Sequence, residues 1–193
     1  LSGHKLVIPA MRALLKEKNT SIDGILCPGH VSAITGYKAF APIVEEFNKP
    51  CVVAGFDPMQ IIEGIAEVCR QIGENKAELV SIYEHASNEE GNQEALSIMN
   101  EVFDEVEGCW RGLGSIESVL SLNEKYQRFD AGQKYELRER PVLVRKDCKC
   151  GDVLTGSINP EDCSLFGDNC TPEKPVGPCM VSSEGSCAAW YKY

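Results

Sequence analysis

The C-terminal segment, residues 141–193, contains six closely spaced cysteines, and they limit how this part of the chain can fold. They are Cys148, Cys150, Cys163, Cys170, Cys179 and Cys187, and Gly, Ser and Pro surround them. The segment has few long apolar runs, so it buries little surface, and metal binding would supply folding free energy. We therefore expect a small Cys-rich domain that depends on bonds to its sulfur atoms.

Three kinds of bond to these sulfur atoms are considered, and the spacing of the cysteines excludes none of them. Disulfides require an oxidising compartment. Zinc prefers paired C-x2–4-C knuckles, whereas this segment has one C-x-C and no C-x-x-C. A 4Fe–4S cluster takes four thiolates at more variable spacings, and six cysteines would leave a dithiol that exchanges electrons with it. The cluster is favoured, and zinc and disulfides remain open.

The preceding part of the chain, residues 1–140, alternates helical and strand-like patterns. The predicted helices cover residues 4–18, 37–48, 58–73 and 94–106, and the predicted strands cover 22–27, 51–55, 78–85 and 110–122. Strands joined by helices favour parallel pairing. The sequence therefore predicts the α/β class, with a parallel-sheet domain over 1–140 that ends in a helical connector near 120–140.

Polar groups gather where two of the predicted strands end, in CPGHVSAITG (27–36) and GFDP (55–58). Ligands of open α/β sheets bind beyond the carboxyl ends of the strands. The candidate residues for a cleft or partner-binding site are Cys27, His30, Ser32, Gly55 and Asp57. A purely structural role is the alternative: a buried thiol, a tight turn at each glycine, and helix caps at the serine and the aspartate.

The charge and hydropathy of the chain restrict its partners and its location. The formal net charge of −10 would repel a nucleic-acid backbone. No apolar run reaches 18 residues, so no membrane span is expected. The chain opens with LSGHKLVIPA, which resembles no export signal, so we expect a cytoplasmic protein with reduced thiols and a fragment of a longer chain.

Four segments combine these features: CPGHVSAITG, CVVAGFDP, CKCGDVLTG and CSLFGDNCTPEKPVGPCMVSSEGSCAAWY. Together they resemble the C-terminal half of the HypD family, the maturation factors of nickel–iron hydrogenases. The resemblance covers essentially the whole chain and is most specific in the Cys-rich segment. It implies that the pattern C-x12-C-x6-C-x16-C on Cys150, Cys163, Cys170 and Cys187 binds a 4Fe–4S cluster. Cys148 and Cys179 are then left as a redox dithiol.

The resemblance also implies a function. Members of the family act as a scaffold on which the Fe(CN)2CO unit is built, with a HypC-type chaperone and a HypE-type cyanide donor as partners. The cluster and the dithiol would pass electrons towards the iron, in a redox-active scaffold rather than a stand-alone enzyme. The family's N-terminal domain, with its Cys-Pro-x-Cys motif and iron-binding thiol, is absent from this sequence, and His30 would face the cleft beside it. The alternatives are a zinc-stabilised interaction module and a stand-alone thiol oxidoreductase that uses Cys148 and Cys179.

Overall fold

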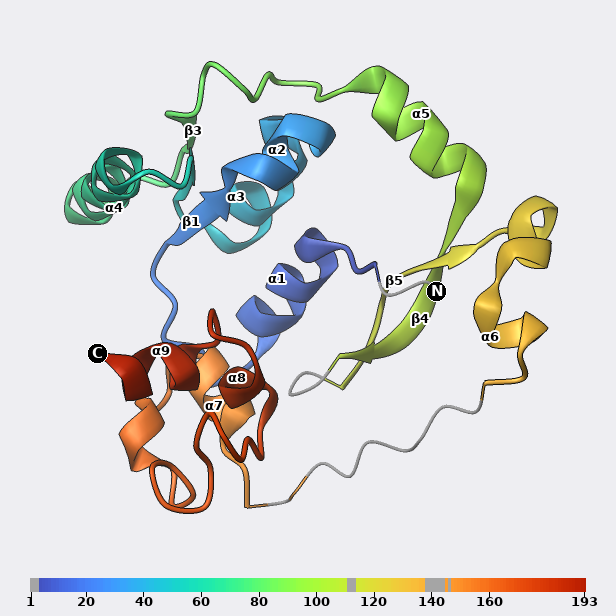
Figure 1. The fold of residues 1–193 in the computed structure, drawn as a ribbon. Coiled ribbons are helices and arrows are strands. Elements are labelled where there is room, and N and C mark those ends of the chain that lie inside the picture. The colour runs from blue at the N-terminus through green and yellow to red at the C-terminus, as the bar shows by residue number, and fades with distance from the viewer. Residues whose placement is uncertain (1–3, 111–113, 138–144, 146) are drawn as a thin grey trace.

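The computed structural model describes residues 4–110, 114–137, 145 and 147–193. Within these residues, Figure 1 shows a parallel α/β region, an antiparallel hairpin on one side of it, and a Cys-rich tail on another. The mixed α/β class expected from the sequence is confirmed, as is the parallel sheet.

The parallel sheet has three short strands: β1 (Ile25–Pro28), β2 (Cys51–Ala54) and β3 (Leu79–Ser81), in the order β1-β2-β3. The central strand β2 is buried along its whole length, as its uninterrupted apolar sequence predicts for a parallel strand covered on both faces. The first strand, predicted over 22–27, begins at Ile25 and includes Pro28 as its last residue. Proline is tolerated there because β1 is an edge strand.

Helices cover both faces of this sheet. On one side lie α1 (Val7–Lys16), α2 (Gly29–Thr35), the 3-10 turn η1 (Tyr37–Phe40) and α3 (Ala41–Phe47), and on the other lies α4 (Pro58–Gly73). Met11, Leu15, Phe40 and Ile43 form the core with the sheet on the first side. The predicted helix 37–48 is divided into η1 and α3 because Pro42 occupies the first turn of α3, where its missing N–H costs nothing.

The start of α4 follows the predicted capping pattern. The carboxylate of Asp57 accepts the backbone N–H groups of Met59 and Gln60, each at 3.1 Å, and Pro58 occupies the first helical position. Gly64 lies so close to the sheet that a Cβ at this position would come within 2.5 Å of Leu26 Cδ1. The cap therefore fixes where the helix begins, and the glycine fixes how closely it packs.

The hairpin differs from its predicted structure. The helix expected over 94–106 ends early as α5 (Gln93–Val102), and β4 (Phe103–Trp110) pairs antiparallel with β5 (Gly114–Leu122). The apolar spacing of 94–106 suits a helix, but antiparallel pairing with the next strand along the chain, β5, decides the outcome for its last turn. The segment that follows contains η2 (Glu124–Phe129) and α6 (Ala131–Lys134).

Over residues 147–193 the Cys-rich tail contains short helical elements: α7 (Cys150–Leu154), η3 (Pro160–Asp162), α8 (Pro178–Val181) and α9 (Ser186–Lys192). It docks on the loop between α1 and β1, where the N–H of Ser21 donates to Thr155 O at 2.8 Å and Ser157 Oγ donates to Asn19 O at 2.5 Å. A helix long and apolar enough to cross a bilayer is not found among the described residues.

Candidate metal centre

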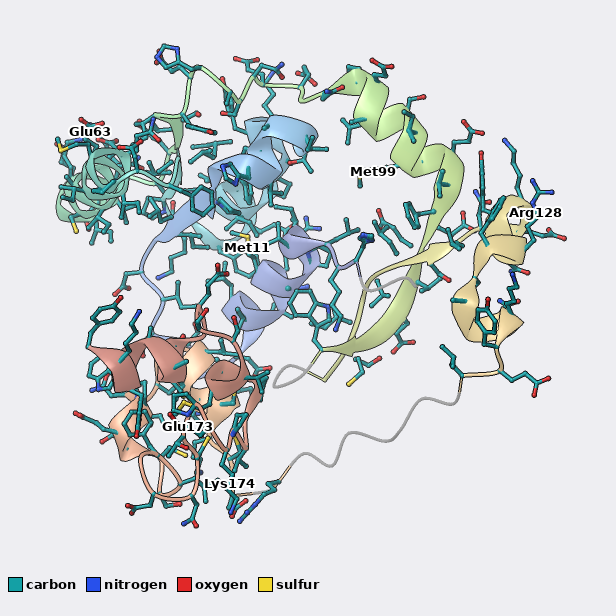
Figure 2. The ribbon with its side chains drawn as sticks, viewed as in Figure 1. Met11, Glu63, Met99, Arg128, Glu173 and Lys174 are labelled. Carbon is teal, nitrogen blue, oxygen red and sulfur yellow. The ribbon has the colours of Figure 1, made fainter. Side chains whose placement is uncertain are left out.

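The six tail cysteines line one small cavity, although they are spread over residues 148–187. They come from five places in the tail: the start of α7, the end of η3, the loop before α8, the helix α8 and the helix α9. Figure 2 shows yellow sulfur atoms gathered among α7, α8 and α9. The short helices thus bring together thiols that the sequence separates.

Apolar packing surrounds these thiols. Cys150, Cys170 and Cys179 are buried, and the other three are half-buried. Met180, which is only 1% exposed, and Leu165 pack in the same cluster. Thiols in such a dry setting are screened from water, and the charge state of each depends strongly on its neighbours.

Glycine is needed where the backbone approaches this site. A Cβ on Gly177 would come within 2.5 Å of Cys148 Sγ, and one on Gly185 within 2.2 Å of Cys179 O. Both glycines precede a helix that carries a cysteine: Gly177 precedes α8, and Gly185 precedes α9. The Gly-rich character of the tail therefore serves close packing around the cavity.

Hydrogen bonds make the thiols unequal. The thiol of Cys179 hydrogen-bonds to Cys150 and lowers the pKa of Cys150 to about 7, and the same bond together with burial raises the pKa of Cys179. Burial, and then the neighbouring thiols, raise the pKa of Cys187 to about 11. Burial also raises the pKa of Cys148. Among Cys148, Cys150, Cys179 and Cys187, Cys150 is thus the thiol that most readily becomes a thiolate, the form that binds metals and attacks disulfides.

The sulfur donors of the six thiols are of the kind that binds iron–sulfur clusters or zinc. Six thiols surround one space, and the backbone N–H of Val176 already donates to Cys170 Sγ at 3.3 Å, the kind of bond that tunes cluster potentials. In the described part of the chain, no three Cys, His, Asp or Glu side chains are grouped closely enough to hold one ion. The thiols therefore face a common space without meeting at one point.

The size of the cavity sets a condition on this fit. Its volume is about 20 Å³, room for about one water molecule. A cubane would need the cysteine side chains to move outward around it. The tail's short helices and loops, joined by few long-range backbone bonds, are the elements that would carry this movement.

The predicted division of the six cysteines into four ligands and one dithiol stays a prediction. Cys150, Cys163, Cys170 and Cys187 share the cavity with Cys148 and Cys179, so both groups lie in the same place. The thiol of Cys179 interacts most strongly with that of Cys150, and Cys148 also raises its pKa. Spacing gave no means of finding that pair.

Of the five strand-end residues predicted to form a cleft or partner-binding site, four have structural roles and one, His30, is exposed beside a cavity. Cys27 is 1% exposed in the core against Cys51, and Ser32 is buried with its hydroxyl donating to Pro28 O at 3.1 Å. Asp57 caps α4, and Gly55 is buried beside Tyr83. His30 alone among the five presents an exposed ring, and it stacks on Phe56. Phe56 lies within the GFDP segment, but its spacing predicts no role for it, and no local signal in the sequence marks Tyr83.

His30 also lines a larger cavity, of about 670 Å³. Its walls come from the segment around the start of α1, from α2, from α5 and from the hairpin, and include Leu6, Ile34, Met99, Phe103 and Leu120. The volume is in the range of small-molecule and peptide-binding pockets. His30 thus stands between this cavity and the carboxyl edge of the sheet.

Comparison with known proteins places this arrangement in a family. The model of the HypD family, described as "Hydrogenase formation hypA family", matches residues 1–193. The hydrogenase maturation factor HypD of Escherichia coli K12 is 40% identical over 193 residues, which cover 98% of this chain and 52% of that protein. A putative hydrogenase expression/formation protein of Methanocaldococcus jannaschii is 40% identical over 194 residues, covering 100% of this chain and 54% of that protein.

A third relative extends the same result. The hydrogenase expression/formation protein HupD of Azotobacter chroococcum is 39% identical over 198 residues, or 99% of this chain and 52% of that protein. The chain spans about half the length of the curated relatives it matches. Since the family model covers every residue of the sequence, the chain belongs to the HypD family.

Proposed function

We propose that this chain takes part in nickel–iron hydrogenase maturation and carries the thiol-bound redox centre used in it. The observation that supports this most directly is the single cavity lined by all six tail cysteines. The similarity to the hydrogenase maturation factor HypD of Escherichia coli supports hydrogenase maturation as the process in which the centre would act. The chain would act as a redox-active assembly scaffold rather than as a stand-alone enzyme.

In this proposal a 4Fe–4S cluster is held by Cys150, Cys163, Cys170 and Cys187. The support is the spacing of these residues, their shared cavity and the N–H donated to Cys170 Sγ. When bound, the cluster would supply one-electron transfer next to the remaining thiols. Buried apolar neighbours such as Met180 keep water away from the sulfur atoms.

Cys148 and Cys179 form the proposed dithiol. Reduction of a Cys148–Cys179 disulfide takes up two electrons and two protons and yields two thiols, and oxidation returns them. Both residues line the same cavity as the proposed ligands, which supports electron exchange over a short distance. Reduced thiols of this kind suit the cytoplasm, the compartment that we propose for the protein.

The substrate of the process is the Fe(CN)2CO unit, and we propose a HypC-type chaperone and a HypE-type cyanide donor as the partners. In this chain His30 is the residue placed to meet them, because its ring is exposed and lines the larger cavity. The cargo and the partners belong to the function of the whole family protein, of which this chain spans about half.

Anaerobic purification followed by iron, sulfide and zinc analysis tests the proposal. We expect a brown protein that contains about four iron and about four sulfide ions per chain and gives an EPR signal after reduction. A colourless chain with one zinc and no sulfide would contradict the cluster and indicate a zinc-stabilised interaction module. Equal incorporation of iron in a variant that lacks all six tail cysteines would show that the iron is bound elsewhere.

A further inference from the structure

Three aromatic rings lie together at the carboxyl edge of the parallel sheet. His30 follows β1, Phe56 follows β2 and Tyr83 follows β3. The ring centroids of His30 and Phe56 are 4.2 Å apart with an interplanar angle of 35°, and those of His30 and Tyr83 are 6.4 Å apart at 53°. Each strand thus contributes one ring to the same small group.

Two glycines make room for this group. A Cβ on Gly29 would come within 2.5 Å of Ala54 O and 2.6 Å of Tyr83 Cδ1. A Cβ on Gly55 would come within 1.7 Å of Gln60 Oε1 and 2.8 Å of Tyr83 Cε2. The ring of Tyr83 therefore lies directly against the backbone of both strand ends, and it fixes the positions from which His30 and Phe56 emerge.

Phe56 is 58% exposed, an unusual position for a phenylalanine. Its ring covers one side of the imidazole, while His30 also borders the cavity of about 670 Å³ together with Val31 and Ile34 of the same helix. The imidazole is thereby confined between an aromatic ring and the cavity. Offset or tilted stacking at this separation restricts the rotation of both rings.

We infer that Phe56 is a positioning residue for His30. The ring of Phe56 holds the imidazole of His30 in one orientation where it lines the larger cavity. The ring of Tyr83, packed against Gly29 and Gly55, fixes the backbone that carries both residues. This deepens the proposed function, because it rests on His30 being the cleft-facing residue of the chain. The stack itself is a property of the α/β region and needs no bound metal.

The test compares variants of Phe56 in the whole chain. Phe56→Leu removes the ring, and Phe56→Tyr keeps it. Phe129→Leu is the matched control, because Phe129 is 60% exposed and contacts Tyr126 instead of a histidine. The signals of His30 in a carbon-13 histidine-labelled protein are identified by their loss in His30→Gln.

We expect the ring-proton signals of His30 to be shifted upfield by the stacked phenyl ring. Phe56→Leu should abolish that shift, whereas Phe56→Tyr should preserve it and Phe129→Leu should leave it unchanged. The signals of His85, an exposed histidine outside the group, should not move in any variant. A shift of His30 that survives in Phe56→Leu would overturn the inference.

A chemical measurement gives an independent answer. Diethyl pyrocarbonate transfers its ethoxyformyl group to a ring nitrogen of neutral histidine and releases ethanol and carbon dioxide. Peptide mass spectrometry should show faster modification of His30 in Phe56→Leu, the original rate in Phe56→Tyr, and one rate for His85 throughout. Equal rates for His30 in all variants would contradict the positioning role.

The same samples separate this inference from the proposed function. Phe56→Leu should retain the iron and sulfide of the unmodified chain, because His30, Phe56 and Tyr83 are not among the residues that line the cavity of the tail cysteines. If Phe56→Leu keeps its full iron content and its His30 signals change, the inference is supported. Unchanged His30 signals overturn the inference whatever the iron content, and a chain that never holds iron overturns only the cluster.

Discussion

The backbone N–H of Val176 donates a hydrogen bond to Sγ of Cys170 across 3.3 Å. The next residue, Gly177, approaches Cys148 so closely that a Cβ would lie 2.5 Å from its Sγ. Pro175 and Pro178 flank the pair, and each proline restricts its own φ angle. The segment Pro175–Pro178 therefore contacts two of the six thiols that line the cavity.

Gly177→Ala should displace Cys148 without removing any thiol. The added methyl group has no space beside Cys148 Sγ, and overpacking of this kind costs about 1–3 kcal/mol. We expect a changed rate of Cys148 alkylation by iodoacetamide, measured by mass spectrometry on the reduced chain. Gly73→Ala is the control, because nothing lies within 4 Å of a Cβ at that position. An unchanged rate in Gly177→Ala would contradict the role assigned to this glycine.

Single replacements should divide the tail cysteines into two groups. Cys163→Ala should lose the iron and the brown colour, because three thiolates leave one iron of a cubane without a ligand. Cys179→Ser should retain the iron but no longer form the disulfide. Iron and sulfide content after anaerobic purification, with thiol counting after oxidation, distinguishes the two results. Cys69→Ser changes an exposed thiol outside the tail and should alter neither.

The contact between Cys150 and Cys179 gives this series a second possible outcome. If Cys148→Ser loses the iron while Cys150→Ser retains it, then the dithiol consists of Cys150 and Cys179, and Cys148 is a ligand. That result would overturn the division implied by the family resemblance and keep the cluster. Loss of iron in every single variant would mean that no dithiol is separate from the ligand set.

Gln71 joins α4 to the start of β3 from a fully buried position. Its Oε1 accepts the backbone N–H of Glu78 at 2.8 Å, and its Nε2 donates to Glu67 at 3.0 Å. Gln71→Leu should lower the free energy of unfolding by about 1–3 kcal/mol, because the N–H of Glu78 is left without its acceptor. Urea unfolding followed by circular dichroism measures this. Gln133→Leu, at an exposed glutamine, should change the free energy little, and an equal effect in both variants would contradict the argument.

Glu67 should make stability fall in acid. Hydrogen bonds from Arg70, and then from Gln71, lower its pKa to about 2, below the ordinary glutamate value of about 4.3. A lowered folded-state pKa stabilises the fold above about pH 4.3, and this contribution disappears as the pH falls towards 2. Because the pair lies near the surface, the contribution should not exceed about 1 kcal/mol.

Glu67→Gln tests this contribution. The difference in unfolding free energy between the original chain and the variant should shrink between about pH 5 and pH 2. Glu63→Gln, at an exposed glutamate of the same helix, provides the control. A difference that stays constant over this range would show that Glu67 acts through packing and not through its charge.

The sequence by itself determined the elements that depend on near neighbours. The Asp57–Pro58 cap, the buried strand β2 and the short-element tail with six thiols follow from spacing and residue type, because caps, apolar runs and glycine turns act over a few residues. It also carried the family resemblance that the comparisons confirm.

Only the tertiary structure decided which distant groups meet. It converted the end of the predicted helix 94–106 into β4 by pairing Phe103 with Leu122, stacked Phe56 on His30, and placed Cys179 against Cys150. Such contacts join segments that no local period or propensity relates, and they form because burial and hydrogen bonding across the whole fold outweigh local preference. The physical limit is therefore the range of the interaction: what acts within a turn can be predicted from the chain, and what acts across the fold cannot.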